Sequence, residues 1–493
     1  MSNKKDTGVI TYKDLSLSIA QVDTFQKLEL VQKKGKHTKL ELEATLSGNL
    51  KEMEFYKIQD TVTVFYEQKG KTKILFSGSI DKISMEKDGG KRKIIVTAFD
   101  HTWKMDQTKR KRLFQNPQMK IKEVIEEVMS SYKNSDYLFH IENKAIGQLF
   151  IQYEETDWEF LKRFLSQYYE TPYPEITHQA EKIQIGLQTK PASWNFDSLP
   201  YEMIQDFETY DKMKKNGLNQ LTLAKNIGYK VVSYDLAEIG DQITYRGNPW
   251  YISSVKRELK NGLLTNTYEL HQKERMKTIP YYNKKIAGVS IDGTVADVKR
   301  NKVQVQMEID TGNGGDSNYW FPFSTVASSS DGSGWYCMPE KGESVRVYFP
   351  TRNEKEGYVI TSIKAHEPQS SSSSGGSSGS SGGASTGSVD PMGDPSVRNI
   401  QTEQNNQVQF KEDGVYIMAG AGNGSIILKN DGNVVLDALQ DIKISAGEML
   451  TIIAKNELNL KSQTKIQVIS DSGADMEVKQ GEIQLHGMMI VEN

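Results

Sequence analysis

The chain contains one cysteine, Cys337, among its 493 residues. A single thiol excludes a disulfide framework within the chain and any zinc site with several cysteine ligands. A fold without disulfides is suited to assembly in a reducing cytoplasm. The seven histidines are far apart, and no pair has the His-x-x-x-His or His-Glu-x-x-His spacing of a zinc enzyme. We therefore expect no metal, no cofactor and no catalytic residues, and we expect that the protein is not an enzyme.

Net charge and long apolar runs are also lacking. Lysine and arginine number 61 against 64 aspartates and glutamates, so the formal net charge is −3. Such a weak field argues against a nucleic-acid partner. No run of about twenty apolar residues occurs, so we expect no membrane-spanning helix. The start, Met1 to Gly8, has no apolar run after its lysines, and we expect no secretory signal peptide there.

Proline and aromatic residues are scarce in the C-terminal segment, residues 397–493. No proline follows Pro395, and Phe410 and Tyr416 are the only aromatic residues in the segment. No strand there loses a backbone donor to proline, and the lack of rings suits a narrow core. The segment is acidic, because 8 lysines and arginines against 13 aspartates and glutamates give a charge of −5. This charge disfavours a nucleic-acid role for the segment.

What this segment does contain is a repeat of eight residues. Pairs of apolar residues, separated by one residue, recur in six consecutive octads, and two looser copies follow. The alternation is typical of strands, whose side chains point to opposite faces in turn, and a fixed period indicates one unit stacked on itself. We name these positions the octad residues: Ile426, Leu428, Val434, Leu436, Ile442, Ile444, Leu450, Ile452, Leu458, Leu460, Ile466, Val468, Met476, Val478, Ile483 and Leu485.

The octads also indicate how the segment folds. One short apolar face per octad buries little surface in a single chain and leaves long unpaired strand edges. Winding several copies together closes the edges, and three chains make the smallest closed prism. We therefore predict an intertwined trimeric β-helix whose core consists of the octad residues. A single-chain β-solenoid and an ordinary sandwich are the alternatives.

The first 280 residues are expected to form a β-rich region with a few helices. Strand patterns occur at 39–44, 61–66 and 92–99, with a turn at Lys87-Asp-Gly-Gly-Lys91, and they resume from 182 to 271. Helical spacing of apolar residues occurs near 120–130 and 156–169. The basic run Lys109-Arg-Lys-Arg112 lacks interleaved aromatics, and we interpret it as a solvated or interface-facing turn.

The second helix is predicted to begin with a capping box. Thr156 and Glu159 have the spacing at which a hydroxyl and a carboxylate each bind a backbone donor at a helix start. The preceding Glu154 and Glu155 could be mistaken for a catalytic carboxylate pair. No base, histidine or metal set accompanies them, so we interpret them as favourable charges at the helix N-terminus.

Three stretches follow one another in an order that resembles a known family. They are Phe76-Ser-Gly-Ser-Ile80, Arg112-Leu-Phe-Gln-Asn116 and the most specific, Gln152-Tyr-Glu-Glu-Thr-Asp-Trp-Glu-Phe-Leu-Lys-Arg163. This order resembles the hub part of VgrG (valine-glycine repeat) proteins and the baseplate hub of contractile-tailed phages. The resemblance implies a structural hub motif that consists of Tyr153, Thr156, Asp157, Trp158, Glu159, Phe160 and Leu161.

The stretch after the hub resembles the next module of that family, a small OB-type barrel. Gly293-Thr-Val-Ala-Asp297 and Asn301-Lys-Val-Gln-Val-Gln-Met307 predict its hairpin, and Trp320, Trp335 and Tyr336 are interpreted as packing residues rather than ligand platforms. Cys337 is interpreted as a buried apolar residue. Some phage spikes that resemble this chain have a peptidoglycan-cleaving domain after the barrel. Only a Ser/Gly-rich stretch stands in that place here, so the resemblance implies no lytic activity.

Together, the patterns and the resemblance predict a mainly β fold with a few helices. The expected domains are an α+β hub with two β-rich lobes at 1–280, an OB-like barrel at 286–366, a Ser/Gly-rich linker at 367–396 and a trimeric β-helix spike at 397–493. The C-terminal Met488-Met-Ile-Val491 is an apolar end that a PAAR-type tip protein or a cargo effector would cover. His486, the one histidine near that end, is interpreted as structural.

The resemblance implies the homotrimeric hub and central spike of a contractile injection system. Such a system is a phage tail, a tail-like bacteriocin, a type VI-like or an extracellular injection particle. The expected partners are inner-tube and baseplate proteins, with no nucleic acid and no integral membrane segment. We expect assembly in the bacterial cytoplasm and release or firing with the particle into the target envelope. The alternative is a secreted effector or envelope-binding protein with a glycan-binding or hydrolase role; a β-helical adhesin is disfavoured because no export signal is evident.

Overall fold

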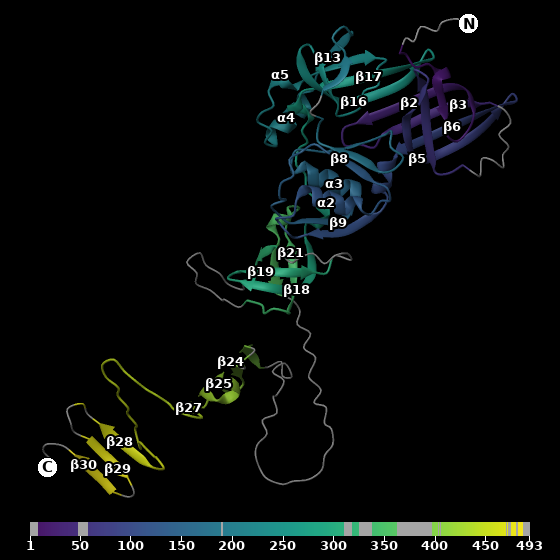
Figure 1. The fold of residues 1–493 in the computed structure, drawn as a ribbon. Coiled ribbons are helices and arrows are strands. Elements are labelled where there is room, and N and C mark those ends of the chain that lie inside the picture. Colours follow the sequence, from purple (N-terminus) through teal and green to yellow (C-terminus); the bar gives the residue numbers. More distant parts are fainter. Residues whose placement is uncertain are drawn as a thin grey trace, which may run out of the picture. The chain divides into compact units, whose positions relative to one another are not determined.

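The computed structural model describes residues 8–47, 58–188, 191–309, 318–324, 338–361, 397–402, 404, 406–469, 471, 475–479 and 482–486. The chain divides into two units, 1–364 and 365–493, and each is described by itself. Strands dominate both units, and short helices occur in the first (Figure 1). The predicted fold class, mainly β with a few helices, is confirmed.

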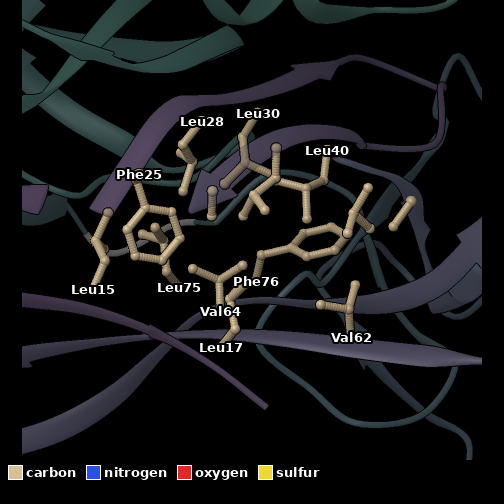
Figure 2. Close-up of a cluster of buried hydrophobic side chains, with 14 of the residues drawn as sticks. Leu15, Leu17, Phe25, Leu28, Leu30, Leu40, Val62, Val64, Leu75 and Phe76 are labelled. Carbon is tan, nitrogen blue, oxygen red and sulfur yellow. The ribbon is translucent and has the colours of Figure 1, made fainter. Parts of the chain in front are cut away.

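The first lobe of unit one is an antiparallel sheet with one buried face. Burial alternates along its strands, as in β6, where every second residue from Ile94 to Asp100 is buried. The turn predicted at 87–91 is confirmed, because Asp88 pairs with Lys91 across the hairpin. Figure 2 shows the core side chains pointing toward one another between the strands. The strands are β1 (Leu15–Leu17), β2 (Val22–Lys33), β3 (Lys39–Leu46), β4 (Thr61–Gln68), β5 (Lys71–Asp88) and β6 (Lys91–Asp100).

A helical lobe follows, in which two amphipathic helices share one core. The predicted apolar face of the first helix, Ile121, Val124, Ile125 and Val128, is fully buried. The second helix ends at Ser166, before the expected residue 169, because Tyr169 adopts a left-handed backbone conformation (φ 64°). The elements are η2 (His101–Asp106), β7 (Lys109–Phe114), α2 (Ile121–Met129), β8 (Asp136–Phe139), β9 (Phe150–Thr156), α3 (Asp157–Ser166), β10 (Pro172–Pro174) and β11 (Lys182–Ile185).

The second lobe continues the sheet of the first. Strand β2 pairs antiparallel with β16, from Ser254 opposite Lys33 to Glu258 opposite Glu29. The sheet path therefore runs β1-β4-β5-β6-β3-β2-β16-β17-β14-β13 through both lobes. The elements are β12 (Pro191–Asn195), β13 (Tyr201–Gln205), α4 (Phe207–Lys215), α5 (Leu223–Asn226), β14 (Ile227–Ser233), β15 (Gln242–Tyr245), β16 (Asn248–Lys260), β17 (Leu263–His271) and α6 (Lys273–Met276).

The last part of unit one is a small five-stranded barrel. Its strand order is β20-β19-β18-β21-β22, and a parallel bridge between Phe323 and Val359 joins the two ends of that order. Gly293 lies where a side chain would meet the backbone of Gln306. The elements are η3 (Lys284–Ile286), β18 (Val289–Lys299), β19 (Lys302–Met307), β20 (Trp320–Pro322), β21 (Ser344–Phe349), η4 (Glu354–Glu356) and β22 (Tyr358–Thr361).

Unit two consists of two antiparallel meanders. Its strand order follows the sequence, β23-β24-β25-β26-β27 and β28-β29-β30. The elements are β23 (Arg398–Gln401), β24 (Gln407–Lys411), β25 (Gly414–Ala419), η5 (Gly420–Gly422), β26 (Gly424–Lys429), β27 (Val434–Ala438), β28 (Lys465–Ile469), β29 (Asp475–Lys479) and β30 (Glu482–His486). The linker predicted at 367–396 and the C-terminal residues 487–493 lie outside the described residues.

Candidate functional site

The hub motif forms the end of strand β9 and the start of helix α3. The predicted capping box is confirmed: Glu159 N donates to Thr156 Oγ1 (3.1 Å), and Thr156 N donates to Glu159 Oε2 (3.1 Å). The Thr156 hydroxyl also donates to Asp106 of η2. These contacts satisfy backbone donors at the helix start and tie α3 to the preceding segment. Three apolar residues of the motif, Trp158, Phe160 and Leu161, lie in the core of the helical lobe.

Asp157, also in the motif, is the centre of a buried polar network. Arg112 donates to both of its carboxylate oxygens, and the Tyr132 hydroxyl donates to Oδ2 (2.6 Å). Gln152 Nε2 donates to Oδ1 (2.8 Å), and Arg110 Nε lies 3.2 Å from Oδ2. Burial and the Asp157 carboxylate both raise the pKa of the Tyr132 phenol, so it remains a neutral donor. The network joins β7, β9, the start of α3 and the turn that follows α2.

This network overturns the interpretation of the basic run at 109–112. The run is not a solvated turn; it forms strand β7, which pairs antiparallel with β9. Side chains on a strand alternate, so Arg112 points inward to Asp157 while Lys111 remains outside, 3.5 Å from Glu154. The Asp157 carboxylate is what allows the Arg112 guanidinium to be buried.

A second buried ion network joins the hub to the barrel. Arg163 of α3, 1% exposed, donates to both oxygens of Glu155 (2.7 and 2.8 Å) and to Glu354 of η4 (2.7 Å). Burial alone would lower the pKa of Arg163, but the carboxylates of Glu354 and Glu155 outweigh it and raise that pKa. Arg163 therefore stays charged. The Arg163 guanidinium thus binds one carboxylate of the hub, Glu155, and one of the barrel, Glu354.

The role expected for Glu154 and Glu155 at the helix N-terminus is therefore wrong. Glu155 is buried in the Arg163 network, and burial raises its pKa even though Arg163 opposes the shift. Glu154 has a left-handed backbone (φ 52°), and its carbonyl accepts from Lys285 (2.5 Å). Sequence spacing could not show that residue 163 would meet residue 354 in another domain.

Apolar packing continues across the same junction. Residues Leu113, Leu149 and Ile151 of the hub belong to the hydrophobic core of the barrel, and Tyr153 packs against that core. Asn283 Nδ2, just before the barrel, donates to the Tyr153 carbonyl (2.8 Å). The hub motif thus contacts the barrel on one side and, through Trp158, contacts His37 of the first lobe, with ring centroids 4.5 Å apart.

Ten of the sixteen octad residues lie on strands of the two meanders, in β26 to β30. Directly opposite partners in an antiparallel pair point to the same face. In the β26–β27 hairpin, Ile426 pairs with Leu436 and Leu428 pairs with Val434. In the last meander, Ile466 pairs with Val478, which in turn pairs with Ile483. Within each meander, an apolar pair thus lies opposite the pair of the next octad.

This apolar face is uncovered in a single copy. Thirteen of the sixteen octad residues are between 37% and 67% exposed. Of the four octad pairs between Val434 and Leu460, the pair Val434/Leu436 lies on strand β27. The other three pairs lie in a segment that has no assigned strand. A groove lined by Ile400, Ile417, Ile426, Leu436 and Ile442 opens on the first meander.

Within the described residues, no group of three His, Cys, Asp or Glu residues is arranged to hold a metal ion. No helix in that part of the chain is long and apolar enough to cross a membrane. Residues Trp335, Tyr336 and Cys337 lie outside the described residues, as does the side chain of His486.

Two family models match the first unit. Residues 39–168 match the phage tail baseplate hub family, and residues 291–363 match the OB domain of the type VI secretion system and phage-baseplate injector. The first match includes the hub motif and both buried networks up to Arg163, and the second includes Glu354. No curated protein matches the chain.

Solved structures with similar folds come from the same kinds of assembly. The Francisella PdpA–VgrG complex, half-lidded, is 10% identical with a TM-score of 0.50, over 87% of this chain and 88% of that chain. The E. coli c3393 protein, a type VI secretion component, is 14% identical with a TM-score of 0.48, over 70% and 98%. The 43 kDa tail protein of Shewanella oneidensis prophage MuSo2 is 13% identical with a TM-score of 0.41, over 54% and 99%.

These identities are so low that the likeness to solved structures concerns the fold alone. The assignment rests on the two family models, whose order along the chain agrees with the hub and barrel that the structure places side by side. The chain therefore contains a phage tail baseplate hub domain at residues 39–168, followed at residues 291–363 by an OB domain of the type VI secretion system and phage-baseplate injector kind.

Proposed function

We propose that three copies of this chain form the hub and central spike that close the inner tube of a contractile injection system. The observation that carries the spike is the uncovered octad face of unit two. An apolar stripe of this length is unstable in water, and three copies wound about one axis would cover it. The paired strands of such a prism would then resist axial load as a group, as in a cross-β stack.

The hub–barrel junction supports a mechanical role. Sheath contraction would load the hub, and the barrel would pass that load to the spike. Arg163 and the shared apolar core tie hub and barrel together, so load crosses a packed interface rather than a single covalent linker. The protein would act without catalysis and without a cofactor.

We propose different partners for the two ends of the protein. Inner-tube and baseplate proteins would bind the hub, and a PAAR-type tip protein or a cargo effector would cover the C-terminal end. A neighbour in fold is itself described as a PdpA–VgrG complex. We propose assembly in the bacterial cytoplasm, followed by delivery as part of a phage-tail-like or type VI-like particle that punctures the target envelope.

Native mass tests this proposal. Each chain has a mass of 55.7 kDa, so light scattering on the full-length protein should give about 167 kDa for a trimer. A monomer at micromolar concentration would contradict the proposal. Clearing of peptidoglycan in a zymogram would instead support the hydrolase alternative.

A further inference from the structure

A polar cleft of about 290 Å³ opens in unit one, where the helical lobe meets the second lobe. Ligand sites in proteins begin at roughly 300 Å³, so the cleft suits a small molecule rather than a long chain. The helical lobe contributes Glu142, Lys144 and Glu170 to its lining, and the segment of helix α6 in the second lobe contributes Lys273 and Lys277. Two lobes therefore supply charged groups to one cavity.

Loops at the ends of two parallel strands form one wall of the cleft. β8 and β11 pair in parallel with Phe139 opposite Ile185, so both strands end at the same edge. The loops that follow them contribute residues 140–142 and 187–188 to the lining. Gly186 lets these loops approach closely, because its φ is 81° and a Cβ atom there would lie 2.5 Å from a side chain of the first loop. Strand ends of this kind commonly present ligand-binding residues.

Another wall is the segment of helix α6, which a lysine of the first lobe holds in place. Lys34 Nζ donates to the carbonyls of Met276 and Lys277, each at 2.8 Å. These bonds satisfy carbonyl groups at the end of the helix, which have no partner within it. The backbone that carries Lys273 and Lys277 is thus fixed before any ligand enters.

The charged side chains of the cleft are not paired with one another. Among the described residues, none of Lys144, Lys273, Lys277, Glu142 and Glu170 forms an ion pair. Half-exposed lysines and glutamates elsewhere in unit one do form such pairs, so this is a local feature of the cleft. Three lysines against two glutamates leave the lining with a net charge of +1.

Glu170 is the less exposed of the two glutamates. Its side chain is half-buried and accepts no hydrogen bond from the part of the chain that the structure describes. Burial raises the pKa of its carboxyl, although Lys273 and Lys277 oppose the shift. An ammonium group that entered the cleft would give this carboxylate the charge-assisted hydrogen bond that it lacks.

We propose that this cleft binds a small acidic amino acid, a ligand with two carboxylates and one ammonium group. A simple anion would satisfy the lysines and leave Glu170 unpaired, and a simple cation would do the reverse. A ligand with both kinds of group has a net charge of −1, which balances the lining. Its carboxylates would bind Lys273 and Lys277, and its ammonium group would bind Glu170. The bound ligand would bridge the two lobes, independently of the trimer proposed above.

Isothermal titration calorimetry on the full-length protein tests this binding, with glutamate as the probe. For a ligand of this size we expect a Kd on the order of 1 mM. Glutarate, which lacks the ammonium group, and 4-aminobutyrate, which lacks one carboxylate, should each bind at least about tenfold more weakly, because each leaves a charged group of the cleft unpaired. Absence of saturable glutamate binding, or equal affinity for glutamate and glutarate, overturns the inference.

Variants test which side chains hold each group of the probe. Glu170→Gln should weaken glutamate binding about tenfold and abolish the preference for glutamate over glutarate. Lys273→Met with Lys277→Met should weaken both ligands, whereas the control Lys162→Met, on α3 outside the cleft, should bind glutamate as wild type does. Thermal melting without ligand verifies that each variant is folded. Wild-type affinity for glutamate in folded Glu170→Gln overturns the assignment.

Discussion

The two units of this chain use apolar residues in opposite ways. In unit one, side chains such as Leu40, Phe76 and Val96 are at most 1% exposed and form contiguous cores. In unit two, the octad residues have the same alternation along their strands but face no core of their own. Alternation of apolar and polar residues therefore determines which face of a strand is apolar. Whether a single copy can bury that face depends on how many other strands pack against it.

The largest expected effect on assembly comes from substitutions of octad residues, which test whether unit two needs a core shared between copies. Ile442→Asp with Ile444→Asp would place six carboxylates inside a three-copy prism, at a cost of several kcal/mol for each buried charge. We expect complete loss of the trimer in light scattering. Lys443→Asp lies between the two positions, and the alternation would place it on the outside of the proposed prism, so it should leave the mass unchanged. A stable trimer of the double variant would mean that unit two needs no shared core.

The next effect concerns the buried cation of unit one. Arg163→Met would leave Glu155 and Glu354 without their partner, and breaking a buried ion pair costs about 3–5 kcal/mol. Chemical denaturation should show this loss in the transition of unit one and none in the trimer mass. Lys162→Met, the neighbouring residue on α3, is the control, with an expected change within about 0.5 kcal/mol. Equal effects of the two variants would contradict the network.

Acid should weaken unit one through two histidines, the buried His101 and the half-buried His271. Burial, with help from Lys104, lowers the pKa of His101 to about 4, and burial with Arg275 lowers that of His271 to about 3. The unfolded chain binds these protons below about pH 6.5, so stability falls as pH drops from 6.5 toward 4, by on the order of 2 kcal/mol per histidine. Denaturation of wild type and of His271→Asn at several pH values measures this slope, which should be shallower in the variant. Equal slopes for wild type and His271→Asn would contradict it.

The smallest effect is at the helix cap. Thr156→Ala removes the hydroxyl that accepts from Glu159 N, which should destabilise unit one by about 1 kcal/mol. Thr156→Ser retains the hydroxyl and should lose much less. Thermal melting resolves the two, and identical melting temperatures would show that the cap contributes nothing.

Local patterns predicted local structure well. The apolar face of α2, the capping box of α3 and the hairpin at residues 87–91 each depend on residues a few positions apart, and all are found in the structure. Hub and OB barrel were recognised because short motifs, above all the one around Trp158, resemble a family with a known order of domains.

Long-range partners could not be predicted in the same way. Arg112 was assigned to a turn because four basic residues in a row suggest solvent, yet its partner Asp157 lies 45 residues away. The Arg163–Glu354 pair spans 191 residues and two domains. A single sequence contains no signal that pairs residues so far apart.

The apolar core shared by hub and barrel also limits how such proteins can recombine. Leu113, Leu149 and Ile151 of the hub complete the core of the barrel, and Arg163 of the hub is the ion-pair partner of the buried Glu354 of the barrel. A chimaera cut between residues 280 and 286 would therefore leave the barrel with an incomplete core and with a buried carboxylate, Glu354, that has lost its partner. Exchange of parts between such proteins should occur beyond the barrel, so that hub and barrel are inherited together while the spike varies.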